Sequence, residues 1–122
     1  MEHMTKYTAQ IAGVAHTLRE IFAEMLKAED RTERGRAKLL ALKFADWIDR
    51  QTEEQPPKFQ PLGFKGERLE EFERLALVEF VEVADAIRTA YMNRRTEPNA
   101  YSDAKDAADN LTELVRSWAL LF

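Results

Sequence analysis

Cysteine is absent from this sequence of 122 residues, and glycine and proline are scarce, with 4 residues each. The lack of cysteine excludes disulfides, thiol nucleophiles and cysteine-ligated zinc. It also fits a reducing compartment, so we expect a cytoplasmic location. No apolar run approaches the roughly 20 residues that a membrane-spanning helix needs, and the first ten residues contain no apolar signal core. We therefore expect no membrane association.

A strong charge of one sign is also missing. The chain has 18 basic and 22 acidic side chains, which gives a formal net charge of −4. Binding to a phosphate backbone depends on basic side chains, so we do not expect nucleic acid as a direct ligand. Hydrophobic residues make up 45% and charged residues 33%, which is typical of one globular domain of this length.

The chain does contain apolar residues that recur at intervals of three and four, as amphipathic helices require. This spacing predicts helices over residues 6–28, 31–52, 67–93 and 102–121. No segment shows the alternation of a strand, so the fold class is all-α, a four-helix bundle in a single domain. The first two helices, joined by a short turn, should run antiparallel.

Two segments break the helical spacing. Residues 53–65 contain three of the four prolines, which remove hydrogen-bond donors and bias the preceding residues away from helix. We expect this loop to cover one end of the bundle, and the alternative is that it presents a recognition element. The second break is RRTEPNAY (residues 94–101), in which Pro98 prevents the third helix from continuing, and Ser102 is the expected N-cap of the last helix.

The third and fourth predicted helices carry more apolar residues than a single core-facing stripe requires. Val78 and Val81 extend the apolar arc of the third helix, and Leu120 points away from the main stripe of the last one. A helix that is apolar nearly all round is either central or covered by another chain. We therefore predict a homodimer or a protein partner bound through these residues. The predicted contact set is Val78, Val81, Leu120 and Trp118.

Two glutamates stand inside the most apolar segment, LALVEFVEVADAIRTAY (residues 75–91). Glu79 projects inside the margin of the apolar arc, and Glu82 lies at its boundary. Carboxylates three residues apart share a helix face and can hold a hard cation such as Mg²⁺, with aspartates of SDAKDAADN as further ligands. The alternative is that Glu79 pairs with a basic residue of the first or second helix. The aspartates after Ser102 would then only favour the helix dipole.

The segments LALVEFVEVADAI and DAADNLTELV together resemble the two signature segments of MazG-like, all-α nucleoside-triphosphate pyrophosphohydrolases. The resemblance covers roughly the C-terminal third of the chain. It places Glu79 and Glu82 in the first acidic pair, and Asp106 and Asp109 in the second, where the family has Glu before Asp. It implies that these four carboxylates hold Mg²⁺, which would support cleavage between the α and β phosphates of a nucleotide.

No other catalytic pattern is present. The sequence has no P-loop, no dinucleotide-binding glycine motif and no zinc spacing, and His16 has no neighbouring nucleophile. We therefore predict a small non-catalytic helical protein, without catalytic residues or cofactor, that binds or inhibits a protein partner. An adaptor, an immunity-type protein or a phage-type inhibitor would all fit this description. The alternative is a Mg²⁺-dependent pyrophosphohydrolase.

Overall fold

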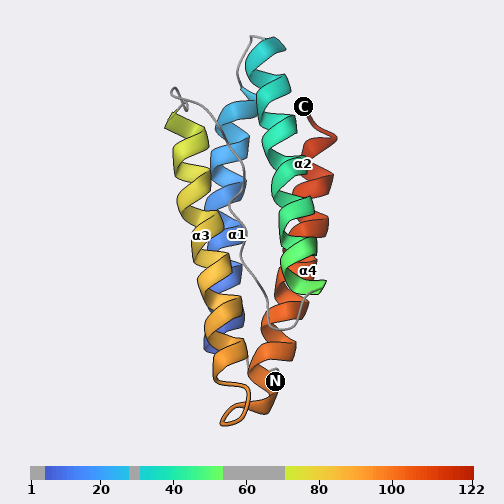
Figure 1. Cartoon of the computed structure of the whole chain (residues 1–122). Helices are drawn as coiled ribbons and strands as arrows, with labels where there is room; N and C mark the ends of the chain where they lie inside the picture. The colour runs from blue at the N-terminus through green and yellow to red at the C-terminus, as the bar shows by residue number, and fades with distance from the viewer. Residues whose placement is uncertain (1–4, 28–30, 54–70) are drawn as a thin grey trace.

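The computed structural model describes residues 5–27, 31–53 and 71–122. These residues form four helices and no strand, which confirms the prediction of an all-α four-helix bundle (Figure 1). The helices are α1 (Lys6–Leu26), α2 (Arg31–Glu53), α3 (Glu71–Met92) and α4 (Pro98–Ala119).

The predicted bounds of the first two helices differ from the structure by two residues at most. The predicted start of the third helix at residue 67 lies outside the described residues. So does nearly all of the proline-containing loop 53–65.

The helices do not follow one another around the bundle. α1 and α4 run in one direction, and α2 and α3 run in the opposite direction (Figure 1). The consecutive helices α1 and α2 are antiparallel, as predicted, but their main packing partners are other helices. α1 packs mainly against α3, α2 packs mainly against α4, and α1 and α4 are also in direct contact.

The inward faces of α1 and α2 are those that the apolar spacing predicts. α1 begins after Thr5, whose side-chain hydroxyl accepts a hydrogen bond from the backbone N–H of Thr8 at 3.2 Å. The buried residues of the α1 stripe are Tyr7, Ile11, Val14, Leu18, Ile21 and Met25. Those of the α2 stripe are Ala37, Leu40, Ala41, Phe44, Trp47 and Ile48.

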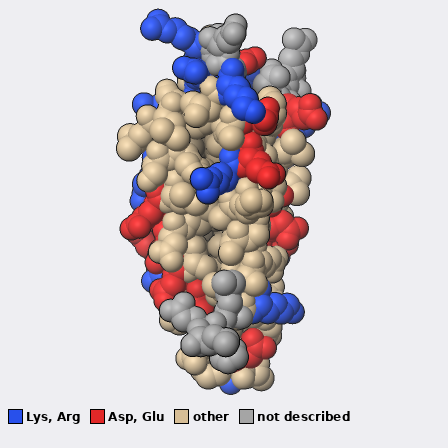
Figure 2. Space-filling view, turned by 180° about the vertical axis from the view of Figure 1, so that it is seen from behind, with Lys and Arg blue, Asp and Glu red and all other residues tan. Residues whose placement is uncertain are grey.

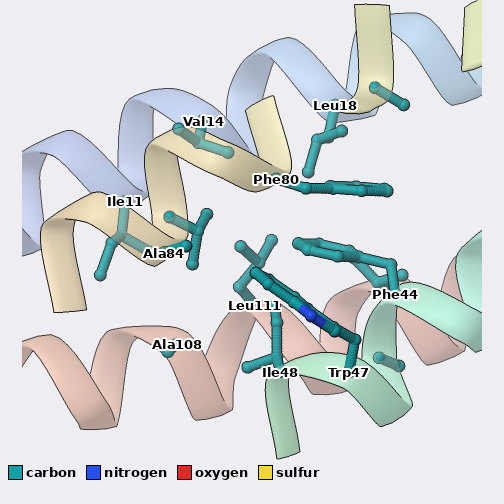
Figure 3. Packing of buried hydrophobic residues seen from close by; sticks show 14 of the residues in the cluster. Ile11, Val14, Leu18, Phe44, Trp47, Ile48, Phe80, Ala84, Ala108 and Leu111 are labelled. Atoms are coloured by element: carbon teal, nitrogen blue, oxygen red, sulfur yellow. The ribbon is translucent and has the colours of Figure 1, made fainter. Parts of the chain in front are cut away.

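A stack of aromatic rings forms the centre of the core. The rings of Phe44 on α2 and Phe80 on α3 lie face to face, with centroids 3.4 Å apart and planes 9° apart. Trp47 stacks against the same Phe44 with a centroid distance of 6.1 Å, and Figure 3 shows the three side chains together. This stack joins α2 to α3 across the bundle, although neither helix is the other's main packing partner.

Polar contacts between helices surround this core. Arg36 on α2 forms an ion pair with Glu73 on α3, and Glu73 is buried. A buried carboxylate that loses its cation is strongly destabilising, so the fold depends on this link between α2 and α3. At the opposite end of α3, the side-chain amide of Asn93 donates a hydrogen bond to the hydroxyl of Tyr7 on α1 at 2.8 Å.

The last helix begins earlier than predicted. α4 starts at Pro98, so Ser102 is an exposed residue of its second turn and not an N-cap. The reason is that proline suits the first position of a helix, where its missing N–H would have no partner and its φ angle is already helical. Because no acidic residue lies in the first turn of α4, the helix dipole does not explain the aspartates that follow.

Three apolar residues of α3 and of the C-terminal segment are partly exposed, namely Phe72, Leu114 and Leu121. Phe72 lies in the first turn of α3, at one end of the bundle. Leu121 follows the end of α4 at Ala119, where the helical spacing no longer applies. Leu114 lies on the wall of a groove described below.

We expect the ring stack to dominate the stability of the fold. Phe80→Ala should lower the free energy of unfolding by about 3–5 kcal/mol, because it removes a fully buried ring and leaves a cavity. Phe72→Ala changes the same residue type on the same helix where the ring is partly exposed, and should lower it by roughly 1 kcal/mol. Urea unfolding monitored by circular dichroism measures both. Equal losses would contradict a core centred on Phe44 and Phe80.

Candidate functional site

The acidic residues that the sequence grouped together lie on different sides of the bundle. Glu79 and Glu82 are both on α3. The side-chain amide of Gln10 on α1 donates a hydrogen bond to Oε2 of Glu82 at 3.2 Å, so Glu82 lies at the edge between α3 and α1. On α4, Asp106 lines a groove that α4 forms with α1. Asp109 lies near Asp49 of α2, whose charge acts on it.

This dispersal does not fit the predicted Mg²⁺ site. Residues three apart on a helix differ by about 60° in direction, so Asp106 and Asp109 point toward different neighbouring helices. Within residues 5–27, 31–53 and 71–122, no three His, Asp or Glu side chains come together in a way that could hold a metal ion. The described residues therefore do not bring Glu79, Glu82, Asp106 and Asp109 into a common ligand set.

Glu79 is the one predicted ligand whose environment is unusual. Burial raises the pKa of its carboxyl group, and the negative charge of Glu82 raises that pKa further. The alternative prediction was an ion pair with a basic residue of the first or second helix. No such pair forms with the described residues of α1 or α2, so Glu79 is half-buried beside a like charge.

The apolar surplus of α3 lies on its solvent-facing side. Leu75, Val78 and Val81 follow one another at intervals of three, and their exposed fractions are 46%, 57% and 55%. We call these three residues the α3 stripe. The opposite side of the helix enters the core through Ala76, Phe80, Val83, Ile87 and Ala90. α3 is therefore not a central helix, and the bundle leaves the α3 stripe uncovered by its described residues.

The other two residues of the predicted contact set lie elsewhere. Leu120, at the end of α4, is 83% exposed. Arg116, one turn earlier, pairs with Asp46 and Asp49, so Leu120 lies over the α2 side of the bundle and not beside the α3 stripe. Trp118 is buried and packs against Phe22 of α1 with a centroid distance of 5.4 Å. The single surface predicted from these residues is therefore divided, and Trp118 belongs to the core.

A groove of about 800 Å³ lies between α1 and α4, and the sequence did not predict it. The view from behind in Figure 2 faces these two helices, and the middle of that face is largely uncharged. The apolar lining consists of Ile11, Ala12 and Ala15 from α1 with Ala107, Leu111 and Leu114 from α4. The charged side chains among the described lining residues are Asp103 and Asp106, both on the α4 wall.

The signal for this groove was present in the sequence but had no meaning without the helix arrangement. Small residues at Ala12, Ala15 and Ala107 leave space between two helices that touch. In the sequence alone, these alanines indicate only helix. They indicate a groove once the structure shows that α1 and α4 lie side by side.

Comparisons with known proteins do not assign the chain to a family: no family model, no curated protein and no solved structure matches it. None of the four described helices is both long and apolar enough to span a membrane. The resemblance of the C-terminal third to MazG-like enzymes therefore stays a prediction.

The position of Glu79 generates a prediction about pH. Because its pKa is raised in the folded state, the folded protein binds this proton more tightly than the unfolded chain does. Stability therefore falls as the pH rises from the unfolded pKa to the folded pKa. Glu79→Gln should stabilise the protein at pH 7, by at most about 1 kcal/mol because the site is partly solvated. The gain should vanish near pH 3, where carboxyl groups are protonated in both states.

Thermal unfolding of both proteins between these two pH values measures the effect. Glu113→Gln, at an exposed position of α4, is the matched control and should show a smaller difference. A Glu79→Gln variant that is less stable than the wild type at pH 7 would indicate a stabilising partner for this carboxylate.

The dispersed carboxylates generate a second prediction, about catalysis. The resemblance to MazG-like enzymes implies that Mg²⁺ supports the release of pyrophosphate from a nucleoside triphosphate and that Glu79→Ala abolishes it. We expect no such release with Mg²⁺ or Mn²⁺ for any common NTP or dNTP, because the four carboxylates point in different directions. A pyrophosphate-release assay tests this. Turnover that Glu79→Ala abolishes and Glu113→Ala leaves intact would establish the enzyme instead.

Proposed function

We propose that this protein is a small non-catalytic binding protein that holds an amphipathic helix of a protein partner in the groove between α1 and α4. The observation that carries the proposal is the groove itself, with its apolar floor and two helical walls. Grooves of this kind take a partner helix by its apolar face. Adaptors, immunity-type proteins and phage-type inhibitors all act by such binding, and we propose this protein for that broad class in the cytoplasm.

The lining of the groove supports a helix as the bound element. Ala12, Ala15 and Ala107 are small, so the backbone of a docked helix can approach the walls closely. Leu114 is 38% exposed at the wall and offers an apolar contact that the bundle itself does not complete. Burial of apolar surface of this kind is the main favourable contribution to most protein association.

The charge of the groove favours a basic partner. Asp103 and Asp106 line the α4 wall one turn apart, and Asp103 is half-buried. An apolar helix flanked by Lys or Arg would place its charges opposite these two carboxylates. Complementary charges of this kind increase the association rate and exclude partners with the wrong sign.

Binding of two model peptides tests the proposal. Each is an amphipathic helix of about 20 residues, long enough to be partly helical alone, with a leucine and alanine face. One carries lysines on its flanks and the other carries glutamates. We expect the lysine peptide to bind and the glutamate peptide to bind at least about tenfold more weakly, a difference of about 1.4 kcal/mol. Fluorescence anisotropy of labelled peptides measures both affinities.

Two arginine variants localise the binding site. Ala12→Arg places a long cationic side chain in the groove and should weaken binding of the lysine peptide at least about tenfold. Ala9→Arg makes the same change on the same helix at an exposed position outside the groove lining, and should have little effect. Failure of the lysine peptide to bind, or equal losses in the two variants, would contradict the proposal.

A further inference from the structure

The α3 stripe is a second apolar surface, separate from the groove. None of the described residues that line the groove belongs to α3. Leu75, Val78 and Val81 are each about half exposed, and they form a row along the outward face of the helix. Exposed apolar residues in a contiguous row indicate contact with another molecule.

The residues around the α3 stripe are arranged symmetrically about Val78. In two antiparallel helices related by a two-fold axis at Val78, a residue n positions before it faces the residue n positions after it in the partner. Leu75 then faces the partner's Val81, so apolar residues meet apolar residues. Arg74 faces the partner's Glu82, so opposite charges meet on both sides of the axis.

From this pattern we infer that the protein is a homodimer in which two copies of α3 pack antiparallel about Val78. A two-fold interface uses the same patch on both subunits, so the patch has to be self-complementary. The α3 stripe and its two flanking charges meet that requirement, because the patch complements an identical patch on a second copy of the chain. This is the reason for choosing a second copy of the chain over an unrelated protein as the occupant.

The flanking charges are available for this pairing. Within the described parts of the chain, Arg74 forms no ion pair, and Glu82 is held only by the neutral amide of Gln10. Flanking charges of opposite sign set the relative direction of packed helices. A parallel pair would instead place Arg74 against the partner's Arg74, so the charges favour the antiparallel arrangement.

Among the described residues of α3, one pair of like charges opposes the dimer. Glu71 would face the partner's Asp85, seven positions from the axis on either side. Asp85 is already paired with Arg88 of its own helix, with an Oδ1 to guanidinium nitrogen distance of 2.6 Å. That ion pair reduces the repulsion, and both groups lie beyond the apolar centre of the interface. The interface is therefore centred on Val78, and its stability depends most on the nearest charges, Arg74 and Glu82.

The first test is the oligomeric state of the whole chain, measured by sedimentation equilibrium over a range of concentrations. The wild type should be a dimer, and Val78→Glu should be a monomer with unchanged helix content because this side chain is exposed. Leu39→Glu is the matched control, since Leu39 is a similarly exposed apolar residue on α2. It should remain a dimer. A monomeric wild type, or a dimer that Val78→Glu does not affect, would overturn the inference.

Charge reversal tests the antiparallel pairing. Arg74→Glu places two glutamates opposite each other on both sides of the axis, and should raise the dissociation constant about tenfold. Glu82→Arg should have a similar effect. The double variant carries both reversals, restores opposite charges across the interface and should return the constant to near the wild-type value. A double variant weaker than either single one would exclude this register.

The absence of cysteine from the chain allows a direct test of the geometry. In Val78→Cys the two introduced thiols lie at the axis, where the Cα atoms can come within the roughly 4–7 Å that a disulfide requires. In Asp85→Cys they would be about 21 Å apart along the helices, given the rise per residue. Mild oxidation should therefore link Val78→Cys into a covalent dimer much faster than Asp85→Cys. Comparable rates for the two variants would indicate a parallel pair, which brings both positions next to their own copies, and would overturn the inference.

This inference does not rest on the proposed function. The dimer tests change only residues of α3 and the control position on α2, whereas the groove tests change α1. A dimer that binds no model peptide would leave the inference standing and contradict the proposed function. Peptide binding by a strictly monomeric chain would do the opposite.

Discussion

The stack of Phe44 on Phe80 is the contact on which the rest of the bundle depends. It joins two helices that run in the same direction and that each pack mainly against another neighbour. The large rings of Phe44 and Phe80 fill the side of the core that lies between α2 and α3. The ion pair of Arg36 with Glu73 joins the same two helices at the edge of the core. On the other side, α4 presents alanines to the core, so α1 and α4 can touch and leave a groove along their outer faces. The bulky and the small sides of the core therefore explain why the groove lies where it does.

The sequence predicted the inward faces of the helices well, because burial along one helix depends only on local spacing. The same spacing carries no information about which helices become neighbours, so the contact between α1 and α4 was not predicted. The start of α4 at Pro98 was not predicted for a related reason. Proline can either end a helix or begin one, and the sequence around Pro98 does not distinguish the two cases. The burial of Glu73 depends on Arg36, a residue on another helix, and no local pattern indicates such a partner.

The acidic motifs show the same limit at the level of function. Two carboxylates three residues apart share a helix face only loosely, since they diverge by about 60°. Whether they act together depends on what each one faces. Asp106 faces the groove, while Asp109 faces the α2 side. Burial raises the pKa of Asp109, the positive charge of Lys105 opposes this rise, and the negative charge of Asp49 adds to it. Glu79 is different, because burial and Glu82 both make its ionisation less favourable. That combination follows from its position near the core margin and does not require a bound ion.

The groove and the α3 stripe, both left uncovered by the described residues, have a joint consequence. The groove belongs to α1 and α4, and the α3 stripe belongs to a helix that contributes no described residue to the groove lining. A dimer formed through α3 therefore leaves both grooves accessible, and the two-fold axis fixes their separation and direction. A partner with two basic amphipathic helices could occupy both grooves at once. The second contact would then form at a high effective concentration, so the pair of grooves would bind such a partner more tightly than a single groove. Self-association through α3 would in this way set the affinity and the partner selectivity of a groove that lies on other helices.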